Sequence, residues 1–143
     1  MVKVVEFTVP GAPVGKGRPR MTKAGHTYTP QNTVQYEHLV RYFYHMQCGT
    51  AKFAPEIPLD VRIVAYFPIP KSASKKRQAM MRVNRLRPTK KPDCDNIAKA
   101  VLDALNDIAY HDDSQVVDHQ LRKFYSDNPR VTVKIIAIEP EEW

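Results

Sequence analysis

The chain has 143 residues, of which 43% are hydrophobic and 26% charged, an ordinary composition for a soluble globular protein. This length suits one domain with its own core and is too short for two, and the absence of any run of about 18 apolar residues argues against a membrane span. We expect no secretory leader at the N-terminus. The two cysteines, Cys48 and Cys94, lack the spacing of a disulfide framework or a zinc site, so we expect a reducing, cytoplasmic location.

Charge is distributed unevenly along the chain, whose net charge is +7. Residues 1–92 hold 17 Lys and Arg against 4 Asp and Glu, whereas residues 93–143 hold 5 against 11. A basic excess of this size indicates a polyanionic partner, with nucleic acid the first candidate. A metal-dependent nuclease needs this combination, because cations hold the phosphates while carboxylates hold the metal.

The first predicted elements are a strand, a loop and a helix. Residues 2–9 are β-branched and roughly alternating, which predicts a strand. Residues 10–28 are rich in Gly and Pro and predict a loop. Residues 29–47 then predict a helix, with Thr29 as its N-cap and Pro30 at its first position. The helix receives an apolar face from Val34, Leu39, Val40 and Phe43.

The remaining elements predict a second strand, two more helices and two final strands. The strand over residues 59–67 alternates, and the helix over residues 72–86, capped by Ser72 or Ser74, lies in a segment with nine Lys or Arg in 21 positions. A helix over residues 96–109 follows, and then strands at 114–126 and 130–140 flank a turn at 127–129. The order β-α-β-α-α-β-β predicts a single α+β domain, residues 1–143, with a small mixed sheet packed against helices.

Asp93 and Asp95 are the first candidate metal ligands. In extended backbone, side chains two residues apart leave the same face, so both carboxylates would point one way and Cys94 would point inward. Two carboxylates this close favour a cation between them, and Mg²⁺ prefers such oxygen ligands. The alternative is a helix start, in which Asp95 or Asn96 bonds the first amides.

Lys99 stands in the predicted first turn of the next helix, where the helix dipole disfavours a cation. Ile97, Val101, Leu105 and Ile108 form the apolar face of this helix. Lys99 is within reach of Asp95 and of anything bound to it. Alternatively, it pairs with Asp103 four residues on.

Asp112 and Asp113 are adjacent like charges just before a predicted strand. One of them could turn back toward Asp93 and Asp95, and three carboxylates from two segments can form a one- or two-metal site for phosphodiester hydrolysis. His111 and His119 are possible further ligands or bases, although a histidine in a charged turn is usually solvated.

The segment "KKPDCDNIAKAVLDALND…HDDSQVVD" resembles the signature of the RusA family of Holliday junction resolvases, found in bacterial and phage genomes. The pattern is Asp-x-Asp-Asn, then Lys, then Asp-Ala-Leu, then Asp-Asp-x-Gln-Val. Upstream, "GKGRPR", "YTP" and "PKSASKKR" also look like stretches that many members carry.

The resemblance implies an endodeoxyribonuclease that cuts four-way DNA junctions in recombination and repair, as a homodimer with Mg²⁺ or Mn²⁺ and no organic cofactor. By position, Asp93, Asp95 and Asp113 would be the catalytic metal ligands with Asp112 beside them, and Lys99 would be the catalytic lysine. The stretch before the Asp-Asp pair is about one residue shorter than in the best-known member. This leaves open whether Asp112 or Asp113 faces the metal, and we favour Asp113. No preference for a cut sequence can be transferred.

Basic residues of the loop and of segment 71–91 are expected to hold the DNA backbone. The predicted DNA-binding residues are Lys16, Arg18, Arg20, Lys75, Lys76, Arg77, Arg85, Arg87, Lys90 and Lys91. A solvated basic helix is the alternative interpretation of the second group.

Two alternatives to a junction resolvase stay open at this point. One is a non-catalytic basic DNA-binding protein, such as a phage regulator, and the other is a flap or RNA nuclease with the same metal site. A two-fold dimer follows from the resolvase hypothesis, because two symmetric cuts require two equivalent sites.

Overall fold

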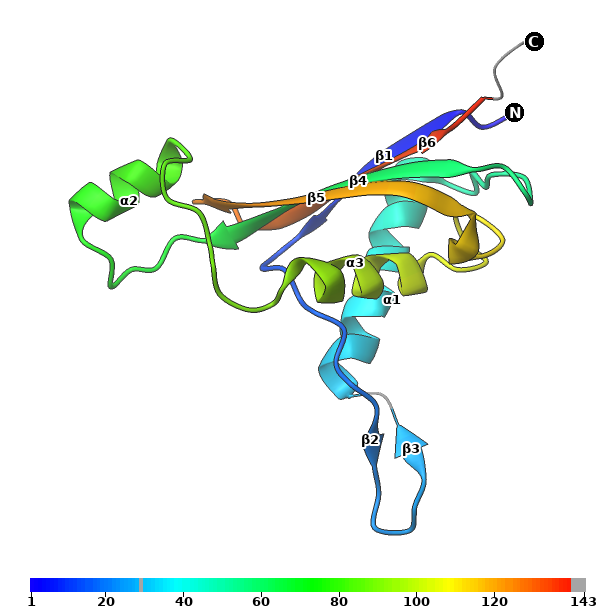
Figure 1. Ribbon diagram of the computed structural model, residues 1–143, viewed down its shortest axis with the longest axis horizontal. Coiled ribbons are helices and arrows are strands. Elements are labelled where there is room, and N and C mark those ends of the chain that lie inside the picture. The colour runs from blue at the N-terminus through cyan, green and yellow to red at the C-terminus, as the bar shows by residue number, and fades with distance from the viewer. Residues whose placement is uncertain (29, 140–143) are drawn as a thin grey trace.

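Four strands form the main sheet in the computed structural model, which describes residues 1–28 and 30–139 (Figure 1). They lie in the order β1-β6-β4-β5, and β4 runs parallel to β5 and antiparallel to β6. Their bounds are β1 Val4–Pro10, β4 Leu59–Pro68, β5 Val116–Ser126 and β6 Arg130–Ala137. The predicted α+β class and mixed sheet are confirmed.

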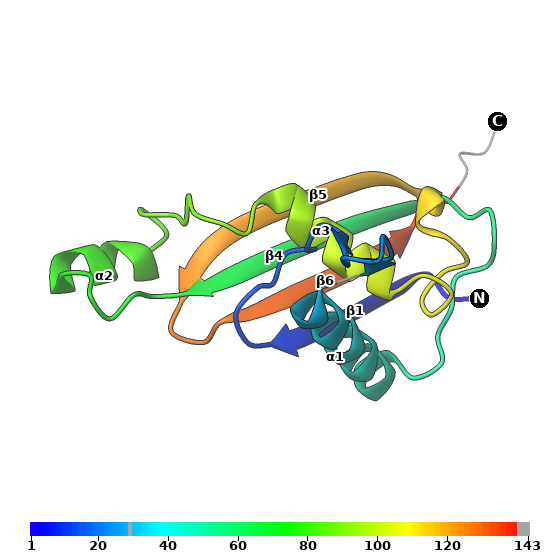
Figure 2. The same cartoon turned by 90° about the horizontal axis from the view of Figure 1, so that it is seen from below.

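Helices α1 (Gln31–Cys48) and α3 (Cys94–Ala104) cover one face of this sheet (Figures 1 and 2). Alternate residues of β4 point toward them and are buried, which is the period-two pattern of a half-buried strand. In the described part of the chain, no helix lies over the opposite face (Figure 1). The core therefore lies between the sheet and these two helices, and α3 is fixed against β5 and α1.

The turn predicted at residues 127–129 connects β5 to β6, but these strands do not pair with each other. Instead, β4 lies between them and pairs with both. The turn therefore passes the end of β4. This arrangement leaves β5 as an edge strand of the sheet, next to α3.

All three predicted helices differ from the structure in their bounds, the second and third the most. Helix α3 begins two residues earlier than predicted, because Asp93 caps it, and ends at Ala104 rather than at residue 109. Asp107, three residues beyond this end, has a φ of 64°, which is incompatible with a right-handed helix continuing to residue 109. Helix α2 (Lys75–Arg82) is shorter than predicted, and its N-cap is Ser74, one of the two predicted caps.

Helix α1 begins at Gln31 with Pro30 as the N-cap, one residue later than predicted, and the predicted cap Thr29 lies outside the described residues. Its buried residues are Thr33, Tyr36, Val40 and Tyr44. Leu39 was expected in the core but is 38% exposed. The helix therefore packs through a face rotated away from Leu39.

The predicted loop over residues 10–28 contains a short hairpin, which the sequence analysis did not predict. Its strands are β2 (Arg20–Met21) and β3 (Thr27–Tyr28), and it projects away from the sheet (Figure 1). Helix α2 forms a second projection at the opposite end of the molecule from the N-terminus (Figure 1). None of the helices in the described residues has both the length and the apolar character that a membrane crossing requires.

Phe7→Ala should destabilise the protein by about 3–5 kcal/mol, because the Phe7 ring is 1% exposed and contacts Tyr44 edge-to-face at 5.3 Å between ring centroids. Urea denaturation measures the loss. The matched control on the same strand is Val4→Ala, at a side chain that is 50% exposed, and should cost under about 1 kcal/mol. Equal losses at the two positions would contradict the burial of β1 under α1.

Candidate active site

The N-terminus of α3 is formed by Asp93, which acts as its N-cap. Its Oδ1 accepts a hydrogen bond from the backbone N–H of Asn96 at 2.9 Å. The prediction of extended backbone through Asp93 and Asp95 is therefore wrong: helix begins at Cys94, whose side chain is exposed rather than inward. The alternative of a helix start is observed, with Asp93 as the cap in place of Asp95 or Asn96.

Asp95, Lys99 and Asp103 follow one another at intervals of four residues and so form a single stripe along α3. All three line a cavity of about 440 Å³. Asp113 and, from β5, His119 line the same cavity. Lys99 lies in the second helical turn, not the first. Helix α3 thus presents a lysine between two carboxylates to this cavity.

Asp113 stands in the short helix η1 (Asp113–Gln115) and brings a third carboxyl group to the cavity. Burial raises its pKa, and the charges of Asp112 and Asp103 and a side-chain hydrogen bond with Asp103 add to this. Its backbone N–H donates to Asn106 Oδ1 at 2.9 Å, which fixes the turn to the end of α3. Asp113 thus shares this cavity with the carboxylate of Asp103, whose charge helps to raise its pKa.

Asp112 has a different environment from its neighbour. It is exposed and caps η1, and its Oδ2 accepts from the backbone N–H of Ser114 at 3.0 Å, a bond that lowers its pKa. The Gln115 side chain completes a capping box with it. Asp112 lines a separate cavity with His111, so that of the adjacent pair only Asp113 shares a cavity with Asp95 and Lys99.

Asp93 lies at a neighbouring cavity of about 580 Å³, which Lys16, Arg18 and Lys91 also line. Asn96 lines both cavities and so marks where they meet. Across residues 1–28 and 30–139, no three His, Cys, Asp or Glu side chains are arranged closely enough to hold a metal ion as they stand. The structure thus brings Asp95 and Asp113 to one cavity and leaves Asp93 beside it.

The donor groups of the first cavity nevertheless fit a divalent cation. Carboxylate oxygens are the ligands that Mg²⁺ prefers, and the ion commonly takes one or two of them together with water and a substrate phosphate. Asp95 and Asp113 would be the residues that hold such a cation, because both line this cavity.

Lys16 was predicted to bind DNA, but its ammonium group lies inside the protein's own ion-pair network. Its Nζ is 2.5 Å from Glu37 Oε1 and 3.3 Å from Asp103 Oδ2, with all three side chains 16–30% exposed. Burial alone would lower the pKa of Lys16, but the bonds to Glu37 and Asp103 outweigh it and the pKa is raised. Lys16 therefore holds Asp103 in place rather than facing solvent.

The close contact between the glycine-rich loop and α3 explains this arrangement. The Lys16 backbone N–H donates to Asn96 O at 2.9 Å. A Cβ atom on Gly15 would lie 2.8 Å from Pro92 Cβ and 3.2 Å from Asn96 Cβ, so only glycine permits this approach. The loop and the start of α3 are thus in direct backbone contact.

Asp103 and Glu37 are site residues that the sequence analysis missed. Asp103 was explained there as a partner of Lys99, whereas it pairs with Lys16. The signal for Asp103 was its spacing of four and eight residues from Lys99 and Asp95. Nothing in the sequence singles out Glu37, which acts from α1 by binding Lys16.

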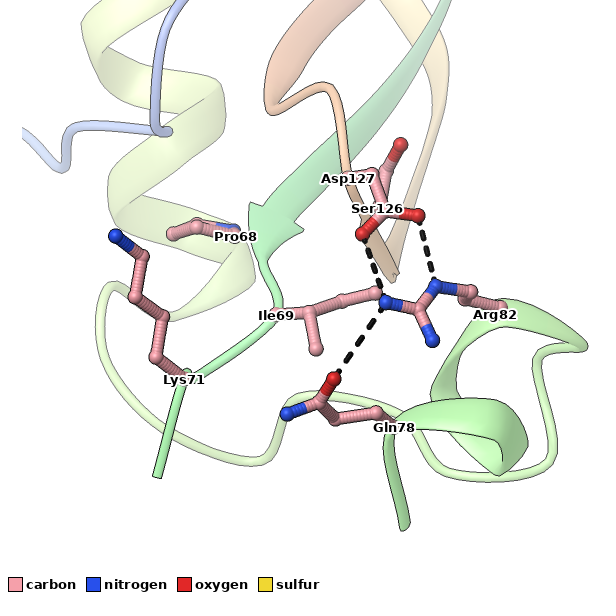
Figure 3. A pocket seen from close by; sticks show the side chains of 7 residues that line it. All are labelled: Pro68, Ile69, Lys71, Gln78, Arg82, Ser126 and Asp127. Carbon is pink, nitrogen blue, oxygen red and sulfur yellow. Dashed lines mark hydrogen bonds and ion pairs between the residues drawn. The ribbon is translucent and has the colours of Figure 1, made fainter. Parts of the chain in front are cut away.

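Segment 71–91 forms an arm whose basic residues divide into two groups. Arg87 and Arg82 bind the protein itself: the Arg87 guanidinium stacks 4.2 Å from the Phe124 ring centroid, and its Nε donates to Lys123 O at 2.9 Å. Arg82 donates to both Asp127 oxygens, at 2.8 and 3.1 Å, across a cavity of about 470 Å³ (Figure 3). The remaining predicted DNA contacts of the arm are exposed: Lys75, Lys76, Arg77, Arg85, Lys90 and Lys91.

The cavity is lined by carboxylates and by a lysine of the same helix, and exposed cations lie near it. Enzymes that cleave phosphodiester bonds use groups of these kinds. Residues 10–136 match the model of the family described as Endodeoxyribonuclease RusA, so the chain belongs to this family, and the resemblance seen in the sequence is confirmed. It is accordingly an endodeoxyribonuclease of a family that acts on Holliday junctions. The chain is also 40% identical over 136 residues to "Uncharacterized protein YqaN" of Bacillus subtilis (strain 168), covering 92% of this chain and 94% of that protein.

Proposed function

We propose that the protein is a Mg²⁺-dependent, structure-selective endonuclease of the cytoplasm. It resolves four-way DNA junctions by paired phosphodiester hydrolysis in recombination and repair, and Mn²⁺ can replace Mg²⁺. The observation that carries the proposal is the shared cavity of Asp95, Lys99, Asp103 and Asp113. Family membership supplies the class of substrate.

Within this proposal the carboxylates have separate roles. Asp95 and Asp113 would hold the ion, and Asp103, which lines the same cavity, is held by Lys16. For Asp93 to join them, its carboxylate would have to release the amide of Asn96. Bound between these residues, a divalent ion would supply an activated water and stabilisation of the departing oxygen.

Lys99 and the surrounding cations act on the DNA. Lys99 neutralises charge that develops on the scissile phosphate, because it stands between two of the carboxylates on the same helix face. Exposed cations on the loop and the arm hold the flanking backbone, which makes binding strongly dependent on salt. Lys16 and Arg87 are left out of this group, since both are bonded within the protein. The proposed contacts are Arg18, Arg20, Lys75, Lys76, Arg77, Arg85, Lys90 and Lys91.

A substrate panel tests the proposal. The purified protein is incubated with labelled four-way junction, flap, linear duplex and hairpin RNA, with and without Mg²⁺. We expect paired, symmetric cuts in the junction that require the metal. Binding without products in any condition would indicate a DNA-binding regulator, and preferential cutting of the flap or the RNA would indicate a different nuclease.

Mg²⁺ should stabilise the protein even without DNA. At a concentration about 100 times its Kd, a ligand that binds only the folded state adds about 2.7 kcal/mol, which raises the Tm of a protein of this size by about 5–10 °C. Thermal denaturation of wild type and Asp113→Asn measures this, and the variant should lose most of the rise. Asp112→Asn is the matched control and should keep it, because Asp112 lines a different cavity. An equal loss in both variants would contradict the assignment of Asp113.

A further inference from the structure

Residues 83–93, the return segment that leads from α2 to α3, are attached to the edge strand β5 (Figures 1 and 2). An edge strand carries backbone groups that no neighbouring strand binds. One of these, Lys123 O, accepts a hydrogen bond from the Nε of Arg87 at 2.9 Å. The Arg87 guanidinium also lies 4.2 Å from the Phe124 ring centroid. The middle of the return segment is therefore bound to β5.

Lys123 makes a second attachment with its side chain. Its Nζ donates to Lys90 O at 2.7 Å and lies 4.9 Å from the ring centroid of the buried Phe67. Lys123 pairs with the buried Ala65 of β4, so its side chain lies on the helix-covered face of the sheet, whereas Phe124 lies on the other face. The return segment is thus held from both faces of β5.

The charge of Lys123 serves this attachment and not an ion pair. Within residues 1–28 and 30–139, its ammonium group pairs with no carboxylate. A hydrogen bond from a charged donor is about twice as strong as one between neutral groups. The acceptor belongs to Lys90, three residues before the N-cap Asp93. Lys123 therefore fixes the backbone just ahead of α3.

Lys91 follows the attached carbonyl directly. It lines the cavity of about 580 Å³ together with Arg18 and Asp93, and this cavity meets the carboxylate-lined cavity at Asn96. Holding the carbonyl of Lys90 limits the positions that the neighbouring Lys91 can take. A cation ordered before binding spares the DNA the entropic cost of ordering it.

We propose that Lys123 is a positioning residue for the DNA strand. By holding Lys90 O, it keeps Lys91 at the cavity beside Asp93, and it acts without touching the DNA itself. The proposal deepens the proposed function and rests on it, because Lys91 is one of the proposed DNA contacts.

Limited digestion with trypsin tests the attachment in the absence of DNA. Trypsin cuts after Lys and Arg except before Pro, so the susceptible bonds of the return segment are Arg85–Leu86 and Lys90–Lys91. The carbonyl that Lys123 holds belongs to the second bond. Lys123→Met should speed cleavage of that bond at least about 10-fold, the effect of losing a hydrogen bond to a charged group. Cleavage at Arg85–Leu86 should stay unchanged.

A conservative variant checks that the contact, not the fold, is responsible. Lys123→Arg should restore part of the protection of Lys90–Lys91, because a guanidinium can also donate to a carbonyl and stack on a ring. Circular dichroism confirms that each variant is folded.

Junction binding and cleavage test whether the attachment serves the reaction. In Lys123→Met, the Kd for a four-way junction should rise about 3- to 10-fold, because the DNA must then order the return segment. The single-turnover rate at saturating protein should stay within about two-fold of wild type. The slope of log Kd against log salt concentration should also stay the same, because no phosphate contact is lost.

Arg122→Met is the matched control. It removes the same charge from the same strand, and Arg122 is exposed on the opposite face of the sheet from Lys123, where it pairs with Val64. Its trypsin cleavage, junction Kd and rate should equal those of wild type.

Three results would overturn the proposal. Unchanged cleavage of Lys90–Lys91 in Lys123→Met would refute the attachment, and an unchanged junction Kd would refute its role in binding. A salt slope smaller by about one, or an equal loss of affinity in Arg122→Met, would assign the effect to charge instead of position. Faster trypsin cleavage in Lys123→Met, with no junction cut by any protein, would support the attachment and reject the resolvase activity.

Discussion

Asp95→Asn is expected to abolish junction cleavage while junction binding stays close to wild type. The substitution keeps the shape of the side chain and removes the charge that would hold a divalent ion beside Asp113. We expect the rate to fall at least about 1,000-fold, equivalent to about 4 kcal/mol of transition-state stabilisation. Binding should persist, because the cations of the loop and the arm are untouched.

The fold should also survive this change. Asp95 is exposed in the first turn of α3, where a carboxylate contributes about 0.3–1 kcal/mol through the helix dipole. Single-turnover cleavage and gel-shift binding of the same junction measure the two effects separately. Asp118→Asn, at an exposed carboxylate on β5, is the control and should cut normally. A fully active Asp95→Asn enzyme would refute the assignment of the metal site.

Lys99→Ala should reduce turnover about 100- to 1,000-fold with the fold intact. The structural alternative for Lys99 was an ion pair with Asp103, but Asp103 is neutralised by Lys16 at 3.3 Å. Lys99 is exposed at the carboxylate-lined cavity, so its removal costs little stability. What it removes is a positive charge at the phosphate.

Comparison with a distant lysine distinguishes local chemistry from general charge. Lys134→Ala removes one charge from the uncovered sheet face, and should weaken DNA binding slightly at most. Lys99→Arg should recover part of the rate by restoring the charge. If Lys99→Ala and Lys134→Ala turned over equally, Lys99 would have no part in the mechanism.

The strands and the class of the fold could be predicted because alternation of apolar residues is a local signal. In β4, which was predicted to alternate, Leu59, Val61 and Ile63 are all fully buried or nearly so. The β2–β3 hairpin could not be predicted, since its strands have two residues each and bury neither. The face of α1 was misjudged at Leu39 because aromatic Tyr36 and Tyr44, not the aliphatic residues alone, fill the core.

The site depended on contacts that sequence spacing does not contain. Asp112 and Asp113 are neighbours with the same chemistry, and only the cap that Asp112 forms with Ser114 and Gln115 separates them. The position of Asp93 as the N-cap of α3 likewise depends on one hydrogen bond, which its side chain accepts from the backbone N–H of Asn96. The ion pair of Lys16 joins segments far apart in the chain, and no local pattern indicates it.

The backbone contact at Gly15 and Lys16 joins the glycine-rich loop directly to the start of α3. Arg18 on that loop and Asp95 on that helix are therefore both anchored close to the same contact. Under the proposed function, a DNA strand that touches both must fit their spacing, and flexible branch points meet such a demand at lower energetic cost than straight duplex does.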